Sequence, residues 1–166
     1  MAASGRVGDR SMIETGSSAP DVRLSFADGD KPLSAYRGHP LVLYFYPKDD
    51  TSGCTREAQD FTALAAEFAA LGCPVIGVSR GSLASHGKFA SKYELAVSLA
   101  SDGDGQVTEA FGVWVEKSMY GKKYMGIERA TFLLDGEGRV ARIWRKVKVP
   151  NHAQEVLDAV RALPGH

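Results

Sequence analysis

Cys54 is the side chain in this sequence best placed for nucleophilic chemistry. It follows the buried-looking apolar stretch Leu41–Tyr46 and a polar loop that begins at Pro47, and it stands where an amphipathic helix begins. The first N–H groups of a helix lack partners within the helix and carry a partial positive charge, so they favour a thiolate over a thiol. Thr51 adds a hydroxyl just before it, and Gly53 lets backbone N–H groups approach an incoming oxygen closely. This segment predicts a reactive cysteine beside a small polar concavity.

The other cysteine and the histidines offer little further chemistry. Cys54 and Cys73 are the only cysteines, which excludes a disulfide framework, a cysteine-rich zinc site and an iron–sulfur cluster. Cys73 follows Gly72 and is expected to be a small buried residue that leads into a strand. The four histidines lack the spacing of metal ligands, so we expect solvated or hydrogen-bonded surface residues at His39, His86, His152 and His166.

The elements that must position Cys54 form a strand–helix–strand unit. Leu41–Tyr46 is apolar on both alternating faces, as in a central strand that is covered on each side. From Cys54 to Leu71 apolar residues recur at steps of three and four, which predicts one amphipathic helix that Gly72 ends. The short apolar run Pro74–Val78 predicts a second strand, parallel to the first.

The rest of the chain completes an α/β pattern. The predicted elements are an edge hairpin within 20–37, a helix from Ser82 or Ser85 to Tyr93, a short helix at Val107–Phe111, a hairpin of Ala130–Leu134 with Arg139–Lys146, and a final helix over Ala153–Leu163. Together they predict a central mixed β-sheet flanked by helices on both faces. We expect residues 13–166 to form a single domain, preceded at 1–12 by a flexible tail that is a vector remnant or lies ahead of an alternative start.

Composition excludes several classes of partner. The chain has 166 residues with 20 basic and 20 acidic side chains, so it lacks the positive charge that binding to a nucleic-acid backbone requires. Its longest apolar run, Pro40–Tyr46, is far shorter than the roughly 20 residues of a membrane span. The N-terminus has no apolar stretch typical of a secretory signal, and we therefore expect a cytoplasmic protein.

The residues around Cys54 resemble the active-site motif of the peroxiredoxins, Pro47-x-x-x-Thr51-x-x-Cys54. The surrounding YFYPKDDTSGCTREA is similar to the subgroup called bacterioferritin comigratory protein or peroxiredoxin Q. Further matches follow in the family's order over nearly all of 13–163: APD from Ala19, LSAYRGHPLVLYFYP, VIGVS, FGVW from Phe111, and RATFLLDGEGRV from Arg129. The resemblance implies a thioredoxin-like fold with the reactive cysteine in the first turn of the helix that follows a strand.

The resemblance also implies a role for each matching residue. Cys54 would attack one oxygen of hydrogen peroxide or an organic hydroperoxide, and Thr51 would hold the peroxide through its hydroxyl. Pro47 would shield the site from bulk water, and Arg129 would face the cysteine and support both the thiolate and the developing oxygen charge. Peroxide cleavage needs such an activated nucleophile and fixed donors where the O–O bond polarises. No metal or organic cofactor is implied.

Departures from the family's pattern bear on how the cysteine is regenerated. Many members carry a resolving cysteine five residues after the first or on the next helix, and here those positions hold Gln59 and Ala90; Ser52 replaces a usual proline. About 17 helical residues, roughly 25 Å, would separate Cys54 from Cys73. We therefore predict a one-cysteine mechanism in which thioredoxin, glutaredoxin or a low-molecular-weight thiol acts as reductant. We expect a monomer or a weak dimer.

Each assigned residue also has a simpler structural explanation. Cys54 could be an inert core thiol, Thr51 an N-cap, Pro47 a strand end and Arg129 a surface cation. Glu57 is expected to be a first-turn acidic residue that stabilises the helix, and its presence excludes a Cys-x-x-Cys oxidoreductase motif. The alternative function is a redox-sensing or chaperone-like binding module in which Cys54 oxidises once without turning over.

Overall fold

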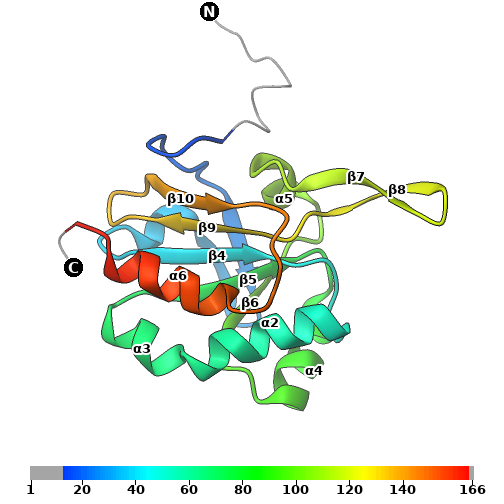
Figure 1. Ribbon diagram of the computed structural model, residues 1–166, viewed down its shortest axis with the longest axis horizontal. Coiled ribbons are helices and arrows are strands. Elements are labelled where there is room, and N and C mark those ends of the chain that lie inside the picture. The colour runs from blue at the N-terminus through cyan, green and yellow to red at the C-terminus, as the bar shows by residue number, and fades with distance from the viewer. Residues whose placement is uncertain (1–12, 165–166) are drawn as a thin grey trace, which may run out of the picture.

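A seven-stranded mixed sheet forms the centre of the structure, a computed structural model that describes residues 13–164 (Figure 1). Its strand order is β10-β9-β4-β5-β6-β2-β3. The strands are β2 (Arg23–Phe26), β3 (Gly29–Pro32), β4 (Leu41–Phe45), β5 (Val75–Ser79), β6 (Ser98–Ser101), β9 (Ala130–Leu134) and β10 (Val140–Trp144). Strands β4, β5 and β6 run parallel, and the remaining neighbours pair antiparallel. The predicted tail at 1–12 lies outside the described residues.

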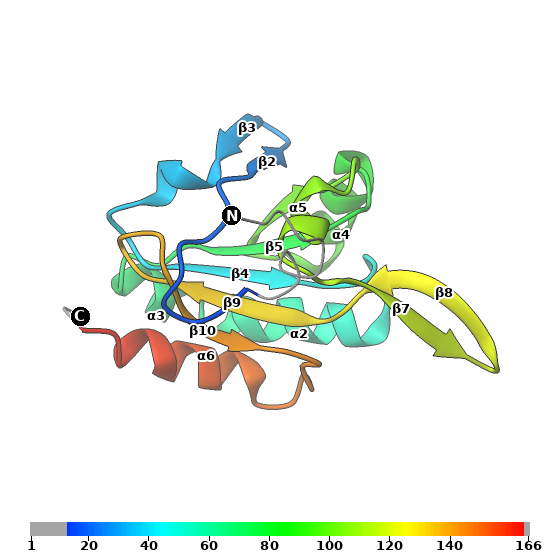
Figure 2. The ribbon, with the colours of Figure 1, turned by 90° about the horizontal axis from the view of Figure 1, so that it is seen from above.

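Helices cover the sheet on both faces, as the sequence predicted. They are the 3-10 helix η1 (Leu33–Tyr36) and the α-helices α2 (Ser52–Ala63), α3 (Ala65–Ala70), α4 (Leu83–Tyr93), α5 (Gln106–Ala110) and α6 (His152–Arg161). Val42 and Tyr44 of β4 belong to the apolar core shared with α2, α3, α4 and α6, whereas Leu43 and Phe45 belong to the core shared with α5. Figure 2 shows α2 and α6 together on one side of β4 and β9. Within 13–164 no helix is both long and apolar enough to cross a membrane.

Most predicted elements are present because their apolar patterns match their burial. All five residues of β4 are buried, and β4 pairs in parallel with β5. Strands β2 and β3 form the predicted hairpin at one sheet edge, and β9 and β10 form the other. Ser82 caps α4 by accepting a hydrogen bond from the backbone N–H of Ser85. The strand–helix–strand unit that carries Cys54 is therefore confirmed.

The predicted single helix from Cys54 to Leu71 is wrong. The structure divides it into α2 and α3 at Leu64, whose backbone angles of φ −103° and ψ 10° are not helical. Neither proline nor glycine marks the break, so the local sequence gives no warning of it. Phe61 before the break and Phe68 after it are both buried in the same core, and their rings lie 5.9 Å apart. Packing in the folded protein thus overrides the helical propensity of the segment.

Strand β6 and a two-stranded arm were not predicted from the sequence. The arm consists of β7 (Trp114–Met119) and β8 (Lys122–Ile127) and extends away from the sheet (Figures 1 and 2). Its tip residues Tyr120 and Gly121 both have positive φ, of 53° and 78°, as a two-residue type I′ turn requires. Because the arm is largely exposed, its residues lack the polar and apolar alternation by which half-buried strands are found.

The prediction of four surface histidines is wrong at His86 and His152, each only 3% exposed. His152 shares a hydrogen bond of 2.8 Å with the hydroxyl of Thr131, and its ring meets those of Phe61 and Trp144 edge to face. Burial, followed by the charges of nearby arginines, lowers the pKa of His152 to about 4. His39 is exposed as predicted, and His166 lies outside the described residues.

Candidate active site

Cys54 lies in the first turn of α2, beyond the carboxyl end of β4. Thr51 occupies the N-cap position, where its carbonyl accepts the N–H of Thr55 at 2.8 Å. The helix therefore directs its free N–H groups towards the loop between β4 and α2. Cys54 is only 1% exposed, so its thiol belongs to a protected site rather than to the open surface. The predicted position of the cysteine in the fold is confirmed.

Arg129 reaches Cys54 from the position directly before β9, the strand next to β4. Ala130 begins β9 and pairs with Phe45 at the end of β4, which places Arg129 beside the start of α2. Its Nη2 donates to Sγ of Cys54 at 3.4 Å, so Arg129 is not a free surface cation. A Cβ on Gly53 would lie 3.1 Å from this Nη2, and glycine there gives the guanidinium room above the helix. The structure thus brings together the two residues most important to the predicted chemistry.

Glu57 holds the other side of the guanidinium, whereas the sequence predicted a first-turn acidic residue that stabilises the helix. It is 1% exposed, and its Oε1 accepts a hydrogen bond of 2.7 Å from Nη1 of Arg129. Its Oε2 has no hydrogen-bond partner among the described residues. Burial raises the pKa of Glu57 to about 7, although the charge and hydrogen bond of Arg129 oppose the shift. Glu57 lies three residues after Cys54 and four before Phe61, so the helical spacing places it on the buried face of α2. This spacing was the signal in the sequence that could have predicted its burial.

Thr51 and Pro47 lie in the loop that leads to Cys54. The hydroxyl of Thr51 donates to the carbonyl of Lys48 at 3.0 Å, and its side chain makes no capping hydrogen bond, so the N-cap explanation holds for its backbone alone. The carbonyl of Pro47 accepts a hydrogen bond of 3.3 Å from Ser79 at the end of β5. These contacts fix the loop at both ends.

Two further side chains respond to the charges at this site, and neither was predicted from the sequence. Burial lowers the pKa of Lys117 on β7, and repulsion from Arg129 lowers it further, while Cys54 opposes the shift. Burial and then the charges of Glu57 and Cys54 raise the pKa of Tyr44 on β4. Within residues 13–164, no three His, Cys, Asp or Glu side chains gather as a metal site would require.

Cys73 lies in a different environment, after α3 and before β5. It is 2% exposed, and its Sγ donates to the carbonyl of Pro74 at 3.6 Å. Burial raises the pKa of this thiol to about 12. The predicted buried position of Cys73 is confirmed.

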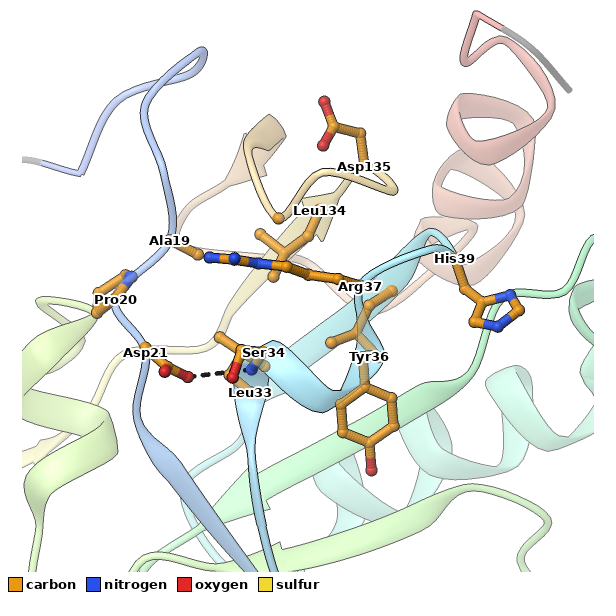
Figure 3. Close-up of a pocket in the computed structure, with 12 residues that line it drawn as sticks. Ala19, Pro20, Asp21, Leu33, Ser34, Tyr36, Arg37, His39, Leu134 and Asp135 are labelled. Carbon is orange, nitrogen blue, oxygen red and sulfur yellow. Dashed lines mark hydrogen bonds between the residues drawn. The ribbon is translucent and has the colours of Figure 1, made fainter.

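The pocket in Figure 3 lies at the opposite end of the sheet from Cys54. It is lined by Leu41, which begins β4, and by Leu134, which ends β9. Asp21 at its rim accepts the backbone N–H of Ser34 at 3.0 Å and so secures the start of η1 (Figure 3). Asp21 of the APD segment therefore stabilises the local fold. The pocket is not part of the site at Cys54, since none of the residues of that site lines it.

The site combines a cysteine in the first turn of a helix with an arginine that directly precedes the neighbouring strand, an arrangement suited to an enzyme that uses a thiol as its nucleophile. The chain matches the AhpC/TSA family over residues 15–143. It is 50% identical over 152 residues to peroxiredoxin Bcp of Xanthomonas campestris, covering 91% of this chain and 95% of the relative. It is 49% identical over 150 residues to peroxiredoxin Bcp of Bacillus subtilis, covering 90% and 96%.

Solved structures agree with these relatives. The solved structure of the bacterioferritin comigratory protein of Xanthomonas campestris has a TM-score of 0.83 at 49% identity, covering 90% of this chain and 98% of that one. That protein has alkyl peroxide reduction activity. The Xylella fastidiosa PrxQ gives a TM-score of 0.85 at 40% identity, covering 90% and 96%. The chain belongs to the AhpC/TSA family of peroxiredoxins and has their thioredoxin-like fold. It is a thiol-dependent peroxidase.

Proposed function

We propose that Cys54 is the peroxidatic residue and that the enzyme works by a one-cysteine mechanism. The observation that carries this proposal is the hydrogen bond of 3.4 Å between Nη2 of Arg129 and Sγ of Cys54, at the first turn of α2. A fixed guanidinium and free helix N–H groups both favour negative charge on sulfur. In this proposal the same donors also stabilise the charge that develops on the peroxide oxygens as the O–O bond breaks.

The reaction has two halves. The Cys54 thiolate attacks the terminal oxygen of a hydroperoxide, the O–O bond breaks, and the leaving oxygen takes a proton to become water or an alcohol. Cys54 is then a sulfenic acid. An external thiol attacks this sulfur and releases water, and a second thiol attacks the mixed disulfide, which restores Cys54 and leaves the reductant as a disulfide.

Thr51 and Pro47 serve the first half in this proposal. Because the Thr51 hydroxyl donates its proton to the carbonyl of Lys48, its oxygen is left as an acceptor for the O–H of the hydroperoxide. Pro47 has no N–H to donate and is half-buried in the loop that leads to Cys54, and we propose that it keeps bulk water away from the thiolate.

The external reductant follows from the absence of a second usable thiol. Gln59 and Ala90 occupy the positions where relatives carry a resolving cysteine, and Cys73 has a strongly raised pKa. We propose that thioredoxin, glutaredoxin or a low-molecular-weight thiol reduces the sulfenic acid. We further propose hydrogen peroxide and organic hydroperoxides as substrates, a cytoplasmic location, a monomer or weak dimer, and one domain over residues 13–166.

Peroxide consumption with excess dithiothreitol tests the proposal. Wild type should turn over repeatedly, because the thiol regenerates Cys54 after each cycle. Cys54→Ser should fall to the rate without enzyme, since a serine hydroxyl stays protonated where a thiolate forms. The matched variant Cys73→Ser should retain wild-type turnover. Turnover by folded Cys54→Ser would refute the assignment, and a single turnover by wild type would instead support the redox-sensing module.

A further inference from the structure

One buried carboxylate, that of Asp49, ties helix α4 to the loop that leads to Cys54. Asp49 lies between Pro47 and Thr51, and its side chain is 6% exposed. Its Oδ1 accepts the hydroxyl of Tyr46 at 2.6 Å, and its Oδ2 accepts the hydroxyl of Ser85 at 2.7 Å and lies 2.6 Å from Nδ1 of His86. Burial by itself would raise the pKa of Asp49, but its hydrogen bonds from His86, Tyr46 and Ser85 outweigh burial and lower it. The side chain is therefore a carboxylate, which can only accept.

Each ring nitrogen of His86 makes its shortest contact with a group that can only accept a hydrogen bond, since the Tyr46 hydroxyl, 3.5 Å from Nδ1, donates its proton to Asp49. Nδ1 faces the Asp49 carboxylate, and Nε2 lies 3.1 Å from the carbonyl of Ala100 on β6. A neutral imidazole has one N–H, so either neutral tautomer would leave one of these short contacts without a proton. Only the doubly protonated ring satisfies both, and this ring is then a buried cation paired with Asp49.

The loop is tied to α4 at a second point and has little freedom between the two. Asp50, which has a positive φ of 60°, accepts hydrogen bonds from Lys92 at 2.9 Å and from the hydroxyl of Tyr93 at 2.6 Å. The hydroxyl of Thr51 closes the turn onto the carbonyl of Lys48. A movement of Asp49 must therefore also move the residues that lead directly into the first turn of α2.

We propose that His86 is a positioning residue for the peroxide reaction: its doubly protonated ring, clamped between Asp49 and the carbonyl of Ala100, holds the loop in the shape that presents Thr51 and Cys54 to a hydroperoxide. The inference rests on the proposed function, because it assigns His86 to the step in which Cys54 attacks the peroxide. The regeneration step, in which an external thiol attacks the sulfenic acid, does not depend on this clamp.

The groups that face the His86 ring decide its protonation. They are the Asp49 carboxylate of the loop, the Tyr46 hydroxyl of β4 at 3.5 Å and the Ala100 carbonyl of β6. Lys88 and Lys92 of α4 line the open depression next to Asp49, on its solvent side. Loss of a ring proton would remove the donor to Asp49 or to Ala100, and would leave Asp49 without the cation that pairs with it.

The spectroscopic arm of the test observes the ring directly. Long-range ¹H–¹⁵N spectra separate a doubly protonated histidine ring from either neutral tautomer. Wild-type enzyme at assay pH should show His86 with protons on both nitrogens. Asp49→Asn keeps the size of the side chain but removes its charge, and it should shift His86 towards a neutral tautomer. A neutral His86 in folded wild type would overturn the proposal.

The kinetic arm separates the peroxide step from regeneration. His86→Phe fills the buried space without a donor, and it should slow the second-order reaction with peroxide about ten- to hundred-fold, the usual size of a lost hydrogen bond to a charge. His86→Asn retains a donor on the Asp49 side and should lose less, which keeps the test available if His86→Phe does not fold. The reaction of the sulfenic acid with dithiothreitol should stay unchanged in both.

The matched control is His39→Asn, because His39 is exposed at the opposite end of the sheet. It should react with peroxide at the wild-type rate. If a folded His86 variant reacts with peroxide as fast as His39→Asn, the positioning role is refuted while the proposed function stands. If wild type itself consumes no peroxide, the proposed function fails instead, so the two failures are distinguishable.

Discussion

The two thiols of this chain are almost equally buried, and yet their surroundings favour opposite behaviour. Cys54 is 1% exposed and Cys73 is 2% exposed. Cys54 faces the guanidinium of Arg129 and the free N–H groups of a helix, whereas the Cys73 thiol donates to a backbone carbonyl and has a pKa raised to about 12. The hydrogen-bond partner of Cys54 is a cation, whereas that of Cys73 is a neutral carbonyl. The charge beside a buried cysteine, rather than its exposure, therefore distinguishes the reactive thiol from the inert one.

Removal of the cation should make Cys54 resemble Cys73, and this is the largest effect expected of a change that keeps both thiols. In Arg129→Met the guanidinium is replaced by an uncharged side chain that still fills space. We expect the second-order rate constant with peroxide to fall, because the loss of a preorganised donor should raise the activation barrier by about 2–4 kcal/mol. Stopped-flow measurement of peroxide reduction checks this.

Arg129→Lys is the control variant that keeps the positive charge but lacks the planar guanidinium group. It should recover part of the rate, because an ammonium restores the cation but cannot donate to Cys54 and Glu57 with two parallel N–H groups. Equal rates for wild type and Arg129→Met would show that the helix N-terminus alone activates Cys54.

Glu57 should make the stability of the fold depend on pH in an unusual direction. Its pKa is raised from 4.5 to about 7, so the folded state holds a proton that the unfolded chain releases. The resulting stability is fully present below about pH 4.5 and is lost as pH rises through about 7, on the order of 3 kcal/mol in total. Urea unfolding of wild type and Glu57→Gln across this range measures it as the difference between the two proteins.

The difference is needed because His152 acts in the opposite direction. The pKa of His152 is lowered to about 4, so the unfolded chain binds the extra proton and stability rises with pH between about 4 and 6.5. The effect of His152 is common to wild type and Glu57→Gln and cancels in the comparison. A difference that stays constant across the range would show that folding does not raise the pKa of Glu57.

The position of Cys54 was predictable, whereas its partners were only partly so. An apolar run, a loop with proline and an amphipathic repeat are local patterns, and they correctly gave β4, the start of α2 and the place of the thiol. Arg129 was identified only through the resemblance to the family. It is distant from Cys54 in the sequence, and only the pairing of β9 with β4 brings the two residues together. Glu57 was predicted only to stabilise the first turn of the helix, since nothing in the local sequence shows that this charged residue is buried.

The errors also have a common physical origin in contacts between distant segments. The break at Leu64 follows from the packing of Phe61 and Phe68, and His86 is buried because Asp49 and Ala100 meet it from two other elements. The arm of β7 and β8 was missed because exposed strands need no apolar face. Patterns within one segment therefore predict elements well and predict buried polar partners poorly.

The smallest expected effect is that of removing Cys73. Cys73→Ala should leave peroxide turnover unchanged and cost about 1 kcal/mol of stability for the small cavity it creates. The reason is the position of the two thiols at opposite ends of β4: Cys73 lies beside the amino end, where Val42 donates to Pro74, and Cys54 lies beyond the carboxyl end. Because the helix breaks at Leu64, the distance of roughly 25 Å expected for one straight helix between the two cysteines no longer applies. Strand β4, which lies between the two thiols, nevertheless spans about 15 Å.

A disulfide tolerates only about 7 Å between Cα atoms, so Cys73 of the same molecule cannot resolve the Cys54 sulfenic acid without unfolding α2. We expect dilute wild-type protein treated with one equivalent of peroxide to gain the mass of one oxygen atom on Cys54 and to keep Cys73 as a free thiol. Higher peroxide should carry Cys54 on to the sulfinic acid, because no neighbouring thiol intercepts the sulfenic acid first. Non-reducing mass analysis distinguishes these products. Loss of two hydrogen atoms from the monomer, with both thiols consumed, would show that the two cysteines meet and that their separation in the fold does not govern the chemistry.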